Sequence, residues 1–140
     1  MGKNLSRWII CWIFGLGIAS SVYAKPIIIK ENLGGHPYEF LSDWKWLYEH
    51  GDNIIIAGRC ESACTLALKF DNVCVKPNAV LGFHAAFIPY HWPKKVWPKA
   101  TRLLEDVVPQ ELRYKLKMPF TSFKMQYIQG KDFPERLKCK

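Results

Sequence analysis

Short apolar runs alternate with an amphipathic stretch in the first half of this chain, and that alternation constrains its fold more than any other feature. Residues 26–30 (PIIIK) and 53–57 (NIIIA) are apolar runs of strand length. Between them, residues 38–50 place their large apolar side chains on one face of a helix. A strand–helix–strand order needs a crossover connection, which joins parallel strands. We therefore expect an α/β fold with a mainly parallel sheet.

The same order continues through the middle of the chain. A short, mostly apolar helix is expected over residues 62–70, and two short strands over 73–75 and 80–83. After these, residues 87–99 carry three prolines and four aromatic residues, which is typical of a surface loop or lid. Three further segments are predicted to form a helical cap within the tail, residues 100–140: 101–107, 110–116 and 121–128.

Residues 1–24 have the three parts of a secretory signal peptide. Two basic residues begin the segment, residues 8–19 are apolar and uncharged, and small residues mark a cut after Ala24. The apolar run is shorter than the roughly 20 residues that span a bilayer as a helix. The alternative is an uncleaved N-terminal anchor. We expect a single exported domain, residues 25–140, that is periplasmic or secreted and is attached to a membrane only if the signal is retained.

An exported domain meets an oxidising compartment, where cysteines form disulfides. Four cysteines follow the expected cleavage site, and the sequence does not choose among their three complete pairings. They are Cys60, Cys64, Cys74 and Cys139. Cys60 and Cys64 together with His84 could also suggest a metal site, but zinc ligands usually show tighter paired spacing. We expect disulfides, at least one of them joining the turn within residues 58–64 to an adjacent element, and no metal or organic cofactor.

The formal net charge of the whole chain is +8. Such a balance permits contact with anionic membranes or polyanions. The basic residues are scattered, however, and they cluster only at Lys94–Lys95 and within residues 138–140. We therefore expect no nucleic-acid binding, and the partners left open are a peptide or ester substrate and a second copy of the chain.

Three segments could together form a hydrolytic site. Gly34 and Gly35 follow a predicted strand, and a glycine pair lets other groups approach its backbone amides closely. Ser62, in GRCESAC, lies between a strand and a helix, where its hydroxyl is exposed and nearby amides favour negative charge. The alternative is that Ser62 only caps the helix. His84 follows a strand and could act as a general base.

The segments LGG, IIIAGRCESACTLAL and NVCVKPNAVLGFHAA resemble, in order and spacing, the core of the Clp protease proteolytic subunit and its crotonase-fold relatives. The resemblance covers residues 26–86 and is strongest to small periplasmic Clp-protease-like proteins of bacteria. It implies a fold of that type, shortened on its N-terminal side. It also implies that Ser62 is the nucleophile and His84 the general base, with the amides of Gly35 and Ala63 holding the oxyanion.

The third catalytic residue of that family is an aspartate well after the histidine. Asp132 has a similar offset, although its surroundings (QGKDFPER) do not resemble the family, and Asp106 and Glu105 are rivals. We expect an exported serine hydrolase, a peptidase before an esterase. One alternative is a catalytically inactive periplasmic binding or assembly protein that keeps the fold. Another is a thiol-redox protein that uses Cys60 and Cys64, although their spacing is not the usual redox pattern.

Cleavage after Ala24 predicts that protein recovered from the periplasm begins at Lys25, because signal peptidases cut after a small-residue pattern. N-terminal sequencing of the exported protein checks this. Recovery of the full-length chain in the membrane fraction would support the anchor and contradict cleavage.

Overall fold

The computed structural model describes residues 25–140, so the expected signal peptide lies outside the described residues. The strands are β1 (Ile27–Asn32), β2 (Ile54–Glu61), β3 (Val73–Val75), β4 (Val80–Phe83) and β5 (Gln126–Gln129). The α-helices are α1 (Pro37–Glu49) and α2 (Pro98–Asp106), and the 3₁₀ helices are η1 (Ser62–Lys69), η2 (Gln110–Lys115), η3 (Gly130–Asp132) and η4 (Glu135–Leu137). Within this part of the chain, no helix has the length and hydrophobicity of a membrane span. The expected α/β class is confirmed.

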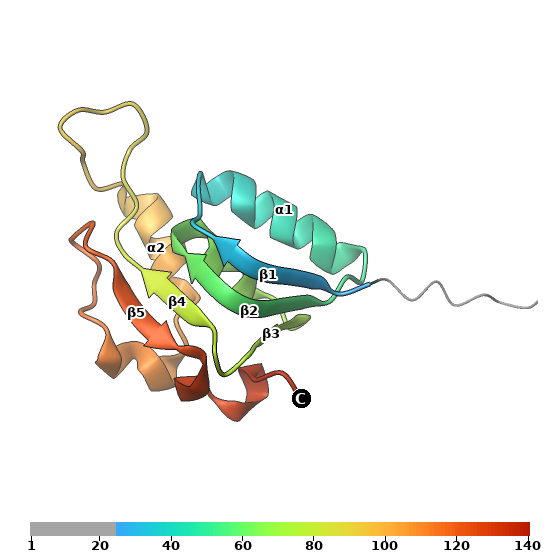
Figure 1. Cartoon of the computed structure of the whole chain (residues 1–140). Helices are drawn as coiled ribbons and strands as arrows, with labels where there is room; N and C mark the ends of the chain where they lie inside the picture. The colour runs from blue at the N-terminus through green and yellow to red at the C-terminus, as the bar shows by residue number, and fades with distance from the viewer. Residues whose placement is uncertain (1–24) are drawn as a thin grey trace, which may run out of the picture.

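Strand β2 is the centre of the sheet (Figure 1). It pairs in parallel with β1 on one side, and on the other side with β3 near its start and with β4 near its end. Because these pairs are parallel, the carboxyl ends of β1, β2 and β4 point toward the same edge of the sheet. The glycine pair, Ser62 and His84 each follow one of these ends, so the topology gathers them.

The expected helix over residues 121–128 is wrong, because residues 121–125 form no helix and the residues after them form a strand. Residues 126–129 form β5, which pairs antiparallel with β4 and makes the sheet mixed. Pairing satisfies the backbone N–H and C=O groups on the free side of β4. Ile128 is buried and Tyr127 is half exposed, a strand alternation too short to distinguish from a helix by sequence. The C-terminal tail is therefore only partly helical.

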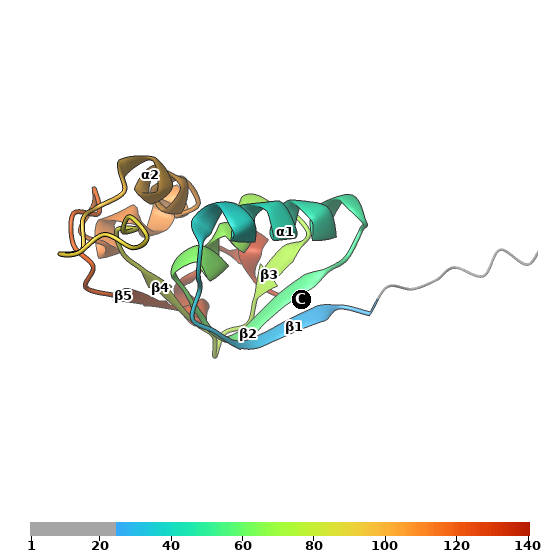
Figure 2. The same ribbon diagram turned by 90° about the horizontal axis from the view of Figure 1, so that it is seen from above.

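Helices α1 and α2 lie over one face of the sheet, and the helices of the described residues leave the other face uncovered (Figure 2). The strands turn their largest apolar side chains toward the helices. Those that are fully buried are Ile54, Ile56, Leu81, Phe83 and Ile128. Helix η1 packs between the sheet and both α-helices, with residues 63–68 buried. This burial fixes the start of η1, where the candidate nucleophile lies.

Two disulfides join the four cysteines of the described residues. Cys60–Cys64 closes the turn between β2 and η1, a pairing that the sequence had left open. Cys74–Cys139 ties β3 to the end of the chain, where the Cys139 amide also donates to the Val75 carbonyl at 3.2 Å. Disulfides of this kind fit an extracellular or periplasmic protein.

Replacing both Cys74 and Cys139 by alanine should lower the free energy of unfolding by about 4 kcal/mol, because that disulfide closes a long loop in the unfolded chain. Its sequence separation is 65, against 4 for Cys60–Cys64. Urea denaturation measures the loss. In the matched Cys60→Ala, Cys64→Ala variant the free energy of unfolding should fall by about 2 kcal/mol, because the closed loop is shorter. Free thiols at all four positions in non-reduced, alkylated protein would contradict both pairings.

Candidate functional site

The residues that follow β1, β2 and β4 line a common cavity of about 360 Å³. Gly34, Gly35, Ser62 and His84 all contribute to its wall. The remaining wall comes from the start of α1 and from residues 86–90. The structure therefore brings together the candidate nucleophile, the candidate base and the glycine pair that the sequence singled out.

Ser62 has a strained backbone. Its φ of +53° lies in the left-handed region, which a residue other than glycine adopts at a cost on the order of 1–3 kcal/mol. The turn is held by the Cys60–Cys64 disulfide and by the Thr65 hydroxyl, which donates to the Ser62 carbonyl at 2.7 Å. A strained strand-to-helix turn of this kind presents a serine hydroxyl at the end of a sheet.

Ser62 is not the cap of η1. The capping position is occupied by Glu61, and no side chain forms a capping hydrogen bond there. Helix capping, the alternative role that the sequence allowed for Ser62, is therefore absent. It does not explain why a serine occupies this strained position.

Gly34 is pressed against the Ser62 turn. Its φ is +79°, and a Cβ at this position would lie 2.6 Å from the Glu61 oxygen, 2.8 Å from the Ser62 Cβ and 2.9 Å from the Ala63 nitrogen. Any side chain would push the two loops apart, so glycine is required here. Sequence reasoning gave the glycine pair a role as amide donor but missed this close packing.

The amides of Gly35 and Ala63 are the candidate oxyanion donors. The Gly34 amide donates to the Asn32 Oδ1 at 2.9 Å, so it is already occupied. Within residues 25–140 the Gly35 amide makes no hydrogen bond. Ala63 lies in the first turn of η1, where N–H groups have no partner inside the helix. Of the two candidate donors, Gly35 lines the cavity, whereas Ala63 is fully buried and does not line it.

His84 is buried, with 8% of its surface exposed, and its ring has a defined tautomer. Its Nδ1 lies 2.6 Å from the Ala85 carbonyl oxygen. Because a carbonyl can only accept, the proton resides on Nδ1, and Nε2 keeps a free lone pair. An unprotonated Nε2 is what a general base requires.

Burial lowers the pKa of His84 below the usual 6.5. The hydrogen bond to Ala85 and the negative charge of Glu61 act in the opposite direction, and the positive charge of Lys94 lowers the pKa further. Since the net shift is downward, the imidazole is neutral at pH 7.

Within the described residues, no hydrogen bond joins the Ser62 hydroxyl to the His84 imidazole. The two side chains line the same cavity without this contact. Catalytic hydrogen bonds are often long or poorly aligned in unliganded enzymes and tighten when substrate binds. Ser62 and His84 thus line one cavity as a candidate serine–histidine pair, but they are not hydrogen-bonded to each other.

The structure does not bring Asp132 to His84. Asp132 lies in η3 and forms an ion pair with Lys115 at 3.2 Å. Because β5 runs antiparallel to β4, Gln129 sits opposite Val80 at the start of β4, and Asp132 lies beyond it. His84 follows the other end of β4, so the two residues lie at opposite ends of the strand.

The two rival carboxylates are also engaged elsewhere. Glu105 accepts the Phe120 amide at 2.6 Å, and Asp106 lines a different cavity. Neither residue forms a hydrogen bond with His84 in residues 25–140. The Ala85 carbonyl therefore occupies the place on Nδ1 where a triad carboxylate would bind.

Glu61 is a site residue that sequence reasoning missed. It is 6% exposed and is held by the Arg59 guanidinium and by the Tyr127 hydroxyl, which donates to Oε1 at 3.0 Å. Its charge acts on His84 through space and favours the imidazolium. The sequence offered one signal for Glu61, its position directly before Ser62. Its partner Tyr127 could not be identified, because Tyr127 belongs to β5, which the sequence analysis did not predict.

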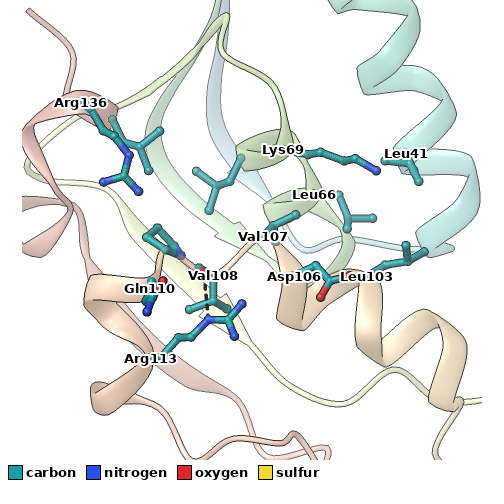
Figure 3. Close-up of a pocket in the computed structure, with 13 residues that line it drawn as sticks. Leu41, Leu66, Lys69, Leu103, Asp106, Val107, Val108, Gln110, Arg113 and Arg136 are labelled. Carbon is teal, nitrogen blue, oxygen red and sulfur yellow. Dashed lines mark hydrogen bonds between the residues drawn. The ribbon is translucent and has the colours of Figure 1, made fainter.

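A second cavity of about 520 Å³ lies on the helical side of the molecule (Figure 3). Its wall combines aliphatic side chains with four charged ones, those of Lys69, Asp106, Arg113 and Arg136. Arg113 donates to backbone carbonyls of α2 and the following turn, and Arg136 pairs with Glu111. No serine, histidine or cysteine lines this cavity, so it does not contain a second serine–histidine or cysteine–histidine pair.

Within residues 25–140, no group of three or more histidine, cysteine, aspartate or glutamate side chains is placed to hold a metal ion. No family model, curated protein or solved structure matches the chain. The structure shows an α/β protein with a mixed five-stranded sheet, and the Clp-protease/crotonase resemblance stays a prediction.

Proposed function

We propose that this protein is an exported serine hydrolase that cleaves a peptide or ester bond, with Ser62 as nucleophile and His84 as general base. The observation that carries the proposal is the strained turn at Ser62. It is closed by a disulfide, packed against Gly34, and opens into a cavity that also contains a neutral histidine. Strain that the surrounding structure maintains is concentrated at functional sites.

The reaction begins when the His84 Nε2 accepts the proton of the Ser62 hydroxyl as its oxygen attacks the substrate carbonyl. The carbonyl electron pair moves onto oxygen, and the amides of Gly35 and Ala63 donate to that oxyanion. As the tetrahedral intermediate collapses, the His84 imidazolium gives its proton to the leaving amine or alcohol. A water molecule then hydrolyses the acyl-enzyme by the same sequence and frees Ser62.

Two groups support the histidine during this cycle. The Ala85 carbonyl keeps the proton on Nδ1, so that Nε2 carries the free lone pair of a base. The Glu61 carboxylate favours the imidazolium through space, without a hydrogen bond. A neutral carbonyl stabilises an imidazolium less than a bonded carboxylate does, so we expect slower turnover than in an enzyme with a complete triad.

A binding or assembly protein without catalysis is the second candidate. It is favoured by the lack, within the described residues, of a Ser62–His84 hydrogen bond and of a carboxylate bonded to His84. The thiol-redox alternative is not proposed, because Cys60 and Cys64 are fully buried and thiol exchange requires access to the sulfur.

A fluorophosphonate probe should label the protein at Ser62, because a serine next to a neutral histidine loses its proton on attack. Labelling should vanish in Ser62→Ala and slow by about a hundredfold or more in His84→Ala. Mass spectrometry locates the adduct. The matched controls are the exposed residues Ser122 and His50, whose alanine variants should label as the unmodified chain does. Absence of labelling in folded protein would favour the binding-protein candidate.

The labelling rate should rise with pH through a midpoint below 6.5 and be level at neutral pH, because the base acts only when His84 is deprotonated and its pKa is lowered. Glu61→Gln removes a charge that raises this pKa, so its midpoint should move further down. Asp132→Asn should leave the midpoint unchanged. A midpoint above 6.5, or a shift in Asp132→Asn alone, would contradict this assignment.

A further inference from the structure

The segment between β4 and α2, residues 87–97, projects from the body of the protein; we name it the aromatic loop (Figure 1). Its two arms are joined by the bridge between Phe87 and Val96 and by the Ile88 amide, which donates to the Lys95 carbonyl at 2.9 Å. The Trp97 amide donates to the Ala86 carbonyl at 2.8 Å. The loop is thus a paired projection with a defined base.

The base of the aromatic loop is braced against the body. Trp97 packs against the rings of His36 and Tyr38 at the start of α1, with centroids 5.5 and 5.3 Å away. Phe87 packs edge-on against Phe123, with centroids 6.1 Å apart. Aromatic side chains at the base are therefore used for packing, in contrast to those at the tip.

The tip exposes two large aromatic side chains. Tyr90 is 108% exposed and Trp92 is 86% exposed, the highest values among the large hydrophobic residues of 25–140. Tyr90 also has a φ of +58°, and the other positive-φ residue in this part of the chain that is not glycine is Ser62. Bulky residues rarely adopt this conformation. A strained backbone that holds an aromatic ring in solvent indicates a contact surface.

The charged residues near the tip in the sequence are all basic. Lys94 and Lys95 lie in the loop, Lys99 and Arg102 follow in α2, and the sequence has no aspartate or glutamate between Asp71 and Glu105. The Lys94 ammonium lies 4.7 Å from the centroid of the Phe87 ring. Tryptophan and tyrosine favour the headgroup level of a bilayer, and lysines beside them are attracted to anionic lipid.

We propose that the aromatic loop docks the protein on an anionic lipid bilayer, with Tyr90 and Trp92 at headgroup level and Lys94 and Lys95 near the lipid phosphates. This contact is separate from any attachment through residues 1–24. Phe87, Pro89 and Tyr90 also line the Ser62 cavity, so docking holds the mouth of that cavity close to the membrane. The docking itself needs no catalysis.

Co-sedimentation with lipid vesicles tests the proposal. The protein, processed as the producing cell leaves it, should bind vesicles that contain phosphatidylglycerol better than vesicles of phosphatidylcholine alone, and less well as salt screens the lysines. Trp92→Ala should weaken partitioning about tenfold, because it removes one buried aromatic side chain. The controls are Trp46→Ala on α1 and Tyr114→Ala on η2, whose side chains are 56% and 80% exposed. Both should bind as the unmodified chain does, and all these proteins share the same N-terminus.

Equal binding by Trp92→Ala and the unmodified chain would overturn the proposal, as would an equal loss in Trp46→Ala. A Trp92→Ala effect on self-association, with no vesicle binding by the unmodified chain, would overturn it in favour of a protein contact. Ser62→Ala should bind vesicles normally. Normal vesicle binding without fluorophosphonate labelling would therefore refute catalysis while supporting docking.

Discussion

The close contact between Gly34 and the turn at Ser62 is the constraint on which the candidate site depends. Because β1 and β2 are parallel neighbours, the residues that follow them emerge side by side. Within 2.9 Å of a Cβ at Gly34 would lie atoms of Glu61, Ser62 and Ala63, so the two loops fit together only with glycine at this position. This packing places the candidate oxyanion amides next to the candidate nucleophile, Ser62.

The free energy that holds the turn at Ser62 in its strained form is comparable to the cost of the strain. A left-handed serine costs on the order of 1–3 kcal/mol, and a disulfide that closes so short a loop contributes about 2 kcal/mol. The burial of η1 adds to this, because residues 63–68 are buried and a rearrangement of the turn would disturb their packing. Cys60–Cys64 is therefore best understood as a structural closure of the site rather than a redox centre.

The part of the fold that could be predicted is the part built from local patterns. Apolar runs and one amphipathic face predicted the elements within residues 26–86, and parallel pairing then gathered Ser62 and His84. β5 was missed because four residues carry too little periodicity, and Glu61 was missed because its partner Tyr127 belongs to β5. The offset of Asp132 along the chain was misleading, because an antiparallel strand carries it away from His84.

A crystal structure of the fluorophosphonate adduct tests the central claim, that the parts around Ser62 form one catalytic centre. The phosphorus should be bonded to the Ser62 oxygen, with the phosphonyl oxygen within hydrogen-bond distance of the Gly35 and Ala63 amides and His84 Nε2 turned toward the adduct. A phosphonyl oxygen that points into solvent, with both amides unpaired and His84 turned away, would contradict the account.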